Sequence, residues 1–155
     1  MKVKELMSAP VEWVPPSLPI REAARKMRAS NVGCMPVCED RRLLGILTDR
    51  DIVCRLVANG GNADRMHVYD LMTGNVVACL EDQDAQDAAE IMRAKALRRL
   101  PVLDRQRWVV GLLSVDDLYG RMPDDVFAAM IQAIIRAHHS PAGPVASPPD
   151  PRSVP

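Results

Sequence analysis

Residues Gly45–Ile52 read GILTDRDI, and residues Gly111–Leu118 read GLLSVDDL. Each stretch begins with a glycine and aliphatic residues, continues with a hydroxyl side chain, and places an aspartate three positions after the hydroxyl. An apolar run that ends at Thr or Ser and continues into an acidic segment is typical of a strand that leads directly into a helix. The sequence therefore predicts the same strand-to-helix junction twice, 66 positions apart.

The similarity extends outward from these junctions over most of the chain. At an offset of 65, Leu6-Met7-Ser8 matches Leu71-Met72-Thr73, Met27-Arg28-Ala29 matches Met92-Arg93-Ala94, and Pro36-Val37 matches Pro101-Val102. One extra residue between positions 105 and 110 accounts for the larger offset of the junctions. Because the matches persist with a single gap, they indicate an internal duplication. Two copies are too few for a solenoid and predict two lobes related by a pseudo-two-fold axis.

Both copies show the same order of elements: a short amphipathic turn, then strand, helix, strand, strand and helix. In the first copy we expect a turn at 3–7, a strand at 11–14, a helix from Ile20, strands at 34–38 and 43–47, and a helix from Asp49. The second copy predicts a turn at 68–72, a strand at 76–80, a helix from Ala85 that Asp82 or Asp84 caps, strands at 100–103 and 109–113, and a helix from Val115. This alternation predicts an α/β (α+β) fold in which each repeat is a small mixed sheet flanked by helices.

We divide the chain into a first repeat at 1–62, a second repeat at 63–121, an amphipathic helix at 122–139 and a proline-rich tail at 140–155 that we expect to be disordered. The helix carries a broad apolar stripe. Two interpretations of the stripe stay open: it packs on its own chain, or it docks on a second subunit.

Composition excludes several classes of protein. The 155 residues carry 20 basic and 20 acidic side chains, so no excess positive charge indicates nucleic-acid binding. No apolar run reaches the length of a membrane span, and the first ten residues lack the apolar core of a signal peptide, which predicts a cytoplasmic protein with no membrane association. The four cysteines are irregularly spaced and indicate reduced thiols rather than disulfides.

We find no motif for catalysis or metal binding. The sequence has no P-loop, no G-x-S-x-G and no H-E-x-x-H, so we predict that the protein is not an enzyme. Cys34 and Cys38 could share one face of a strand, but a metal site would need two more ligands at a recognisable spacing. They are interpreted as buried thiols, with a redox-sensitive pair as the alternative.

The repeated junction has a chemistry of its own. The start of a helix offers free backbone N–H groups and a partial positive charge, which favour phosphate. The hydroxyls of Thr48 and Ser114 could donate to a phosphate oxygen, and the carboxylates of Asp51 and Asp117 could accept hydrogen bonds from the two hydroxyls of a ribose. The same spacing also resembles a capping box, and capping is compatible with ligand binding.

The two junctions, together with Cys34–Val37 and Arg99–Val102 before them, resemble the cystathionine-β-synthase (CBS) domain over residues 1–121. The resemblance implies a stand-alone CBS pair, or Bateman module, without an attached enzyme or channel. It further implies clefts between the repeats that hold adenine nucleotides or S-adenosyl compounds, with aspartate on the ribose and Thr or Ser near phosphate. Two such modules commonly form a flat dimer, so a homodimer is expected.

The two clefts differ in charge. Arg50 stands where the second repeat has Asp116, and Arg98-Arg99 stand where the first has Gly33-Cys34. We predict phosphate contacts for Arg50, Arg98 and Arg99, with solvated surface charges as the alternative, and therefore unequal affinity of the two clefts. An adenine ring could pack on the apolar residues that open the middle strands, which otherwise belong to the core: Met35, Pro36, Val37, Leu100, Pro101 and Val102.

The sequence thus predicts a non-catalytic sensor that needs no cofactor. Its regulatory ligand would be AMP, ADP, ATP or S-adenosylmethionine, and it would act on a regulated protein that the sequence does not identify. The alternative function is a ligand-free interaction module that acts through its dimer surface.

Overall fold

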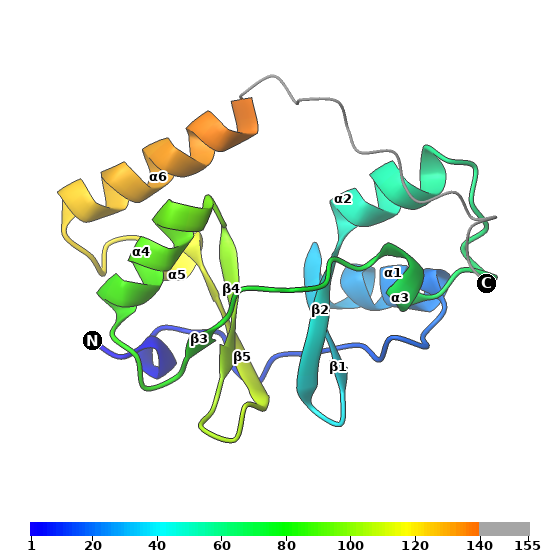
Figure 1. The fold of residues 1–155 in the computed structure, drawn as a ribbon, viewed down its shortest axis with the longest axis horizontal. Coiled ribbons are helices and arrows are strands. Elements are labelled where there is room, and N and C mark those ends of the chain that lie inside the picture. The colour runs from blue at the N-terminus through cyan, green and yellow to red at the C-terminus, as the bar shows by residue number, and fades with distance from the viewer. Residues whose placement is uncertain (140–155) are drawn as a thin grey trace.

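Two β-hairpins stand at the centre of the computed structural model, which describes residues 1–139 (Figure 1). The first hairpin pairs β1 (Cys34–Glu39) with β2 (Arg42–Thr48), and the second pairs β4 (Arg99–Leu103) with β5 (Val109–Ser114). The short strand β3 (Cys79–Leu80) adds to β4 in parallel. Equivalent registers, Cys34 opposite Thr48 and Arg99 opposite Ser114, confirm the predicted duplication.

The first long helix of each repeat forms where its periodicity predicts. Helix α1 (Ile20–Ser30) follows Pro19, and α4 (Ala85–Lys95) follows Asp84. Asp84 accepts a hydrogen bond from the backbone N–H of Gln86, so it is the cap of α4, whereas Asp82 pairs with Arg105 instead. Both helices end at a residue in the left-handed conformation, Asn31 and Ala96.

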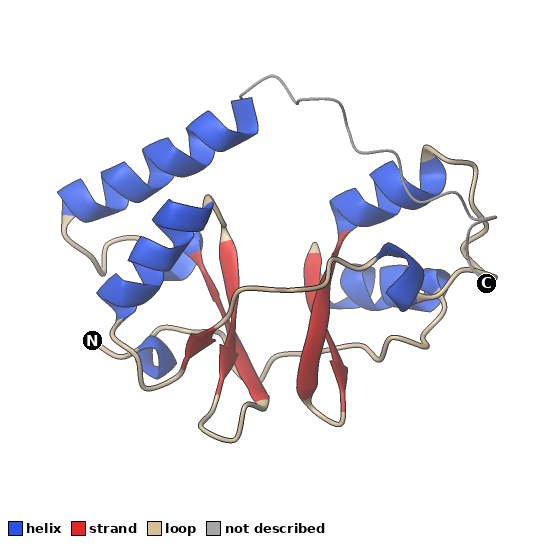
Figure 2. Cartoon of the chain, viewed as in Figure 1, coloured by secondary structure: helices blue, strands red, loops and turns tan. Residues whose placement is uncertain are grey.

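The second helix of each repeat differs between the copies (Figure 2). In the first, α2 (Asp49–Asp51) continues without a break as the π-helix η2 (Ile52–Val57). In the second, α5 (Val115–Leu118) is a single turn, and the chain leaves the helix through Gly120 at a φ of +68°. A glycine adopts this conformation without steric cost, which explains why the helix ends here.

The first turn of each repeat is buried in the core formed mainly by the other repeat. The N-terminal turn η1 (Val3–Glu5) contributes Val3 to the core that contains α4 and β4, whereas α3 (Val68–Leu71) contributes Val68 and Leu71 to the core that contains α1 and β1 (Figure 1). We therefore define lobe 1 as α1, β1, β2, α2, η2 and α3, and lobe 2 as η1, β3, α4, β4, β5 and α5 with the C-terminal helix. These spatial lobes differ from the sequence repeats in their first turns.

The lobes are joined at the turns of the two hairpins. Cys38 of lobe 1 packs with Leu103 and Val109 of lobe 2 in a third apolar cluster. The backbone N–H of Val109 donates to the carbonyl of Arg41 at 2.9 Å, and the Arg41 guanidinium lies 4.8 Å from the centre of the Trp108 ring. The strand-to-helix junctions lie at the other end of the hairpins, away from these contacts (Figure 1).

Two predicted strands are shorter than expected. The segment 11–14 pairs only at Val14, which bridges Val37, and the segment 76–80 forms a strand only at Cys79–Leu80. Pro15 and Pro16 follow Val14 directly, and prolines have no N–H group with which to continue a ladder. The first strand is therefore reduced to a single bridge.

The last helix, α6 (Asp124–His139), packs along α4 (Figure 1). Met130 and Ile134 are 0% and 2% exposed within the core of lobe 2, so this part of the apolar stripe packs on its own chain. The Nδ1 atoms of His138 and His139 lie within hydrogen-bond distance of the carbonyls of Ile134 and Ile135. The predicted tail at 140–155 lies outside the described residues.

Candidate functional site

The junction of lobe 1 is a capping box. The backbone N–H of Asp51 donates to Thr48 Oγ1 at 3.1 Å, and the backbone N–H of Thr48 donates to Asp51 Oδ2 at 2.9 Å. This confirms the predicted capping role. Because Thr48 only accepts in these bonds, its hydroxyl proton remains available to a phosphate oxygen.

The junction of lobe 2 repeats the box with one difference. Asp117 Oδ2 accepts from the backbone N–H of Ser114 at 2.7 Å and also from its hydroxyl at 2.8 Å. The single hydroxyl proton of Ser114 is therefore directed at Asp117 rather than outward. Ser114 is suited to hold the carboxylate, and a phosphate at this junction needs other donors.

The strand starts lie against the two junctions. The N–H of Asp49 donates to the carbonyl of Gly33 at 2.9 Å, and the N–H of Val115 donates to that of Arg98 at 3.0 Å. Burial raises the pKa of the Cys34 thiol to about 11, while the positive charge of Arg99 opposes this rise. Arg99 begins β4 of lobe 2, so its charge acts on Cys34 across the two lobes.

The structure separates the residues predicted to pack on adenine. Met35 and Val37 are fully buried in the core of lobe 1, and Leu100 and Val102 are fully buried in the core of lobe 2. In this arrangement these four side chains have no surface for a ligand. Pro36 and Pro101 point to the opposite face of their strands, because side chains alternate along a strand, and they are also buried.

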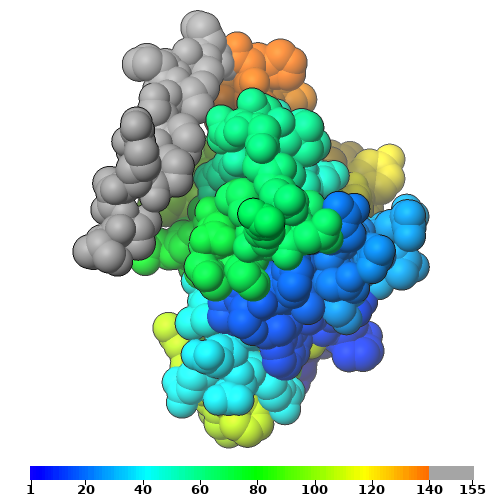
Figure 3. Space-filling model, turned by 90° about the vertical axis from the view of Figure 1, so that its right-hand side faces the viewer, coloured from blue at the N-terminus to red at the C-terminus, as the bar shows by residue number. Residues whose placement is uncertain are grey.

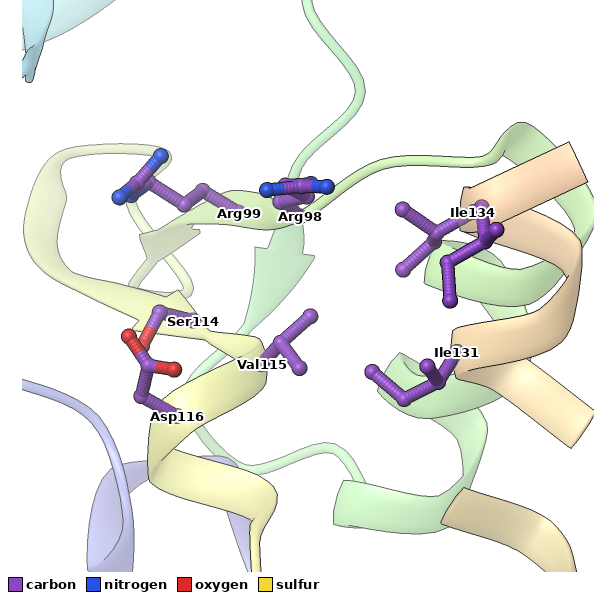
Figure 4. A pocket seen from close by; sticks show the side chains of 8 residues that line it. Arg98, Arg99, Ser114, Val115, Asp116, Ile131 and Ile134 are labelled. Carbon is purple, nitrogen blue, oxygen red and sulfur yellow. The ribbon is translucent and has the colours of Figure 1, made fainter. Parts of the chain in front are cut away.

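A pocket of about 290 Å³ lies at the junction of lobe 2 (Figure 4). Three of the predicted phosphate-binding residues meet there: Arg98, Arg99 and Ser114. The other lining residues are Val115, Asp116, Ile131, Ile134 and Ile135. Arg50 does not line this pocket; it is exposed on α2. Asp117 lies beside it, bonded to Ser114.

The three isoleucines come from α6, and they are not among the site residues predicted from the sequence. The apolar stripe of α6 was visible in the sequence, but a stripe does not show which of its residues reach a pocket and which fill the core. In Figure 4, Ile131 and Ile134 form one side of the pocket, and Arg98, Arg99, Ser114 and Asp116 lie across from them. The pocket therefore has a charged side and an apolar side.

The charged side is positive overall, with two guanidinium groups and the Asp116 carboxylate. Within residues 1–139, neither Arg98 nor Arg99 forms an ion pair. Arginine binds phosphate through several parallel N–H donors, so two unpaired guanidinium groups in one pocket suit an anionic ligand.

Residues 1–139 contain neither a candidate metal site nor a membrane-spanning helix. No group of three or more His, Cys, Asp or Glu side chains among residues 1–139 is placed to hold a metal ion. None of the helices in this part of the chain has the length and hydrophobicity that crossing a membrane requires.

Comparison with known proteins identifies the family. The CBS domain model matches residues 3–58 and 68–124, so the chain belongs to the CBS-domain family. The CBS domain-containing protein YhcV of Bacillus subtilis is 37% identical over 116 residues, which cover 75% of this chain and 81% of that protein. The family assignment confirms the resemblance of the two junctions to the CBS domain.

Solved structures confirm the tandem-repeat fold. The CBS domain pair of protein MJ0100, in complex with 5′-methylthioadenosine and S-adenosyl-L-methionine, superposes with a TM-score of 0.67 at 29% identity, covering 76% of this chain and 92% of that one. The CBS domain protein PAE2072 of Pyrobaculum aerophilum, complexed with AMP, superposes with a TM-score of 0.72 at 24% identity over 85% of this chain and 99% of that one. The second comparison supports the fold alone.

Proposed function

We propose that this chain is a non-catalytic sensor that binds an adenine nucleotide or an S-adenosyl compound at the junctions of its two CBS repeats. A bound ligand shifts the packing of the lobes to the extent that it binds one arrangement more tightly than another. A regulated protein then recognises that arrangement.

The observation that carries the proposal is the pocket of lobe 2. Arg98 and Arg99, which form no ion pair among residues 1–139, line it together with Ser114, and Asp117 lies beside it as a carboxylate that the Ser114 cap holds in a fixed orientation. Such a carboxylate suits the hydroxyls of a ribose, and the guanidinium groups suit phosphate. The related MJ0100 pair, with its two adenosine ligands, supports the adenosine part of the proposal.

Thermal denaturation with a panel of AMP, ADP, ATP and S-adenosylmethionine tests the proposal. A ligand that binds only the folded state stabilises it by about 2.7 kcal/mol at a concentration 100 times its dissociation constant. We expect at least one member of the panel to raise the melting temperature. If none does, and calorimetry detects no binding, the sensor function is wrong.

A second candidate function is a protein-interaction module, and the surface of lobe 1 favours it. Val53 and Val57 of η2 are 58% and 63% exposed, and Tyr69 of α3 is 54% exposed. The two elements are in contact, and Figure 3 shows the segment that contains them on the outer face of lobe 1. Exposed apolar side chains on neighbouring elements are typical of an interaction surface.

We propose a second copy of the chain as the partner at this surface, which would give a homodimer. The double variant Val53→Ser and Val57→Ser should convert the dimer to a monomer in light scattering. Val32→Ser, at another exposed valine, provides the control. A monomeric wild-type protein, or a dimer that the double variant leaves intact, would contradict this assignment.

A further inference from the structure

Helix α6 lines the candidate ligand pocket although nearly all of it lies beyond the CBS repeats. The second family match ends at Asp124, the first residue of α6. The residues of α6 that line the pocket, Ile131, Ile134 and Ile135, all lie after that point. The apolar side of the pocket is therefore a property of this chain rather than of the repeat.

The apolar residues of α6 form two groups that differ in burial. Met130 and Ile134 are buried against α4 and hold the helix on lobe 2. Ile131 and Ile135 are four residues apart, so their side chains are neighbours along one side of the helix. Ile131 is half-buried and Ile135 is 46% exposed, and both line the pocket. A molecule that enters the pocket would remove these two side chains from water.

The side of the pocket opposite α6 carries the positive charge of two guanidinium groups. Arg98 and Arg99 lie across from the isoleucines and form no ion pair among the described residues (Figure 4). A molecule that satisfies both sides must carry an anionic group at one end and an apolar, flat or aliphatic group at the other. The volume of about 290 Å³ is at the small end of ligand sites, which favours a nucleoside monophosphate over a triphosphate.

We propose that α6 is a wall of the ligand site: a nucleoside monophosphate binds with its phosphate at Arg98 and Arg99 and its base against Ile131 and Ile135. The proposal rests on the sensor function above and adds its regulation. Because the same ligand contacts α6 and the start of β4, occupancy adds to the packing of Met130 and Ile134 that already holds α6 on lobe 2, and a partner protein that contacts α6 can respond to this change. The factor by which the ligand favours the docked position of α6 equals the factor by which docked α6 favours ligand binding, since coupling between two equilibria is reciprocal.

The test compares two α6 variants that keep the folded core. Ile135→Ala removes apolar surface from the pocket, and the partial exposure of Ile135 makes this change compatible with folding. Gln132→Ala is the matched control, because Gln132 is exposed on the same helix and does not line the pocket. By calorimetry we expect Ile135→Ala to weaken AMP binding roughly three- to tenfold, as loss of buried aliphatic carbons predicts, and Gln132→Ala to leave binding unchanged.

Hydrogen exchange provides the second measurement. AMP should slow exchange of the α6 amides in the wild-type protein, with a smaller effect in Ile135→Ala at equal ligand excess. If the wild-type protein binds AMP but Ile135→Ala binds equally well, or if α6 exchange does not respond, the role of α6 is wrong and the sensor function stands. If the wild-type protein binds no member of the ligand panel, the sensor function fails and this proposal fails with it.

Discussion

Arg55 lies one helical turn beyond Asp51, with its Nε atom 3.7 Å from Asp51 Oδ1. Its Nη1 atom also donates to the carbonyl of Leu71 at 2.8 Å, which fixes the guanidinium beside the carboxylate. Arg121 has the equivalent position after Asp117, but α5 ends at Leu118 and no ion pair joins the two within residues 1–139. The carboxylate of lobe 1 is therefore already ion-paired, whereas that of lobe 2 forms no ion pair among the described residues.

This difference predicts unequal nucleotide binding at the two junctions. Asp117 should accept ribose hydroxyls without competition from an ion-pair partner, whereas Asp51 must share its charge with Arg55. We expect one tight site per chain for AMP in calorimetry. Asp117→Asn should weaken that site about tenfold or more, as loss of a hydrogen bond to a charged group predicts, and Asp51→Asn should change it much less.

Each of these variants keeps a side-chain oxygen that can continue the capping box, so the comparison does not depend on folding. The unliganded melting temperature of each variant is the control. Two equal and independent sites in the wild-type protein would contradict the prediction, as would a larger effect of Asp51→Asn than of Asp117→Asn.

The arginine pair predicts a preference for phosphate. Replacing both Arg98 and Arg99 with alanine should weaken AMP binding about tenfold or more, because each charge-assisted hydrogen bond contributes about 1.5–3 kcal/mol. Adenosine has no phosphate, and its binding should change little. The ratio of AMP to adenosine affinity, measured by calorimetry, checks this.

Arg93→Ala serves as the control, because Arg93 pairs with Glu90 on α4 and does not line the pocket. An equal loss of AMP and adenosine affinity in the double variant would indicate that the two arginines support the shape of the pocket rather than bind phosphate.

The capping boxes predict a measurable contribution to stability. Thr48→Ala removes the oxygen that accepts from the Asp51 N–H, and loss of such a cap costs about 1 kcal/mol. Thr48→Ser keeps the hydroxyl and should stay within a few tenths of a kcal/mol of the wild-type protein. Urea denaturation measures the free energy of unfolding of both variants. A neutral Thr48→Ala variant would show that the box does not stabilise the junction.

The sequence was sufficient to predict the duplication, most element boundaries and both capping boxes, because these depend on local periodicity and on residues three positions apart. It could not show that the turns around Val3 and Val68 exchange lobes. An amphipathic turn buries its apolar side equally well in either of two similar cores, so its pattern does not identify its partner. The pocket is a similar case: Ile134 and Ile135 have the same chemistry in the sequence, and only the packing of α6 shows that Ile134 is buried in the core while Ile135 is exposed at the pocket.

The cysteines predict a simple order of reactivity. Burial raises the thiol pKa of Cys34, Cys38 and Cys79 to about 11, whereas Cys54 is exposed on η2. The thiolate is the reactive form, so an aromatic disulfide reagent at neutral pH should modify one thiol rapidly and three slowly. The fast phase should disappear in Cys54→Ser. A second fast thiol in that variant would contradict the burial of the other three.

The same thiols predict how stability depends on pH in the alkaline range. Their folded pKa of about 11 lies above the ordinary value of 9.0, so the unfolded chain releases these protons first. Their contribution is fully present below pH 9 and is lost as the pH rises toward 11. Replacing Cys38 with serine or alanine should reduce the steepness of this loss in denaturation curves measured between these pH values.

Because the first turns exchange lobes, substitution of Gly45 should lower the free energy of unfolding. A Cβ atom at this position would lie 2.6 Å from the backbone carbonyl oxygen of Thr73, in the segment that follows α3. A backbone atom cannot rotate away as a side chain can, so Gly45→Ala should push this segment off β2, break its bridge to Ile46, and cost about 1–3 kcal/mol. Gly74→Ala, where a Cβ atom meets nothing within 4 Å, is the matched control and should be close to neutral. Urea denaturation gives both values, and hydrogen exchange at Thr73 and Ile46 shows whether the loss is local. If Gly45→Ala were as stable as Gly74→Ala, the close approach of the exchanged segment to β2 would be wrong.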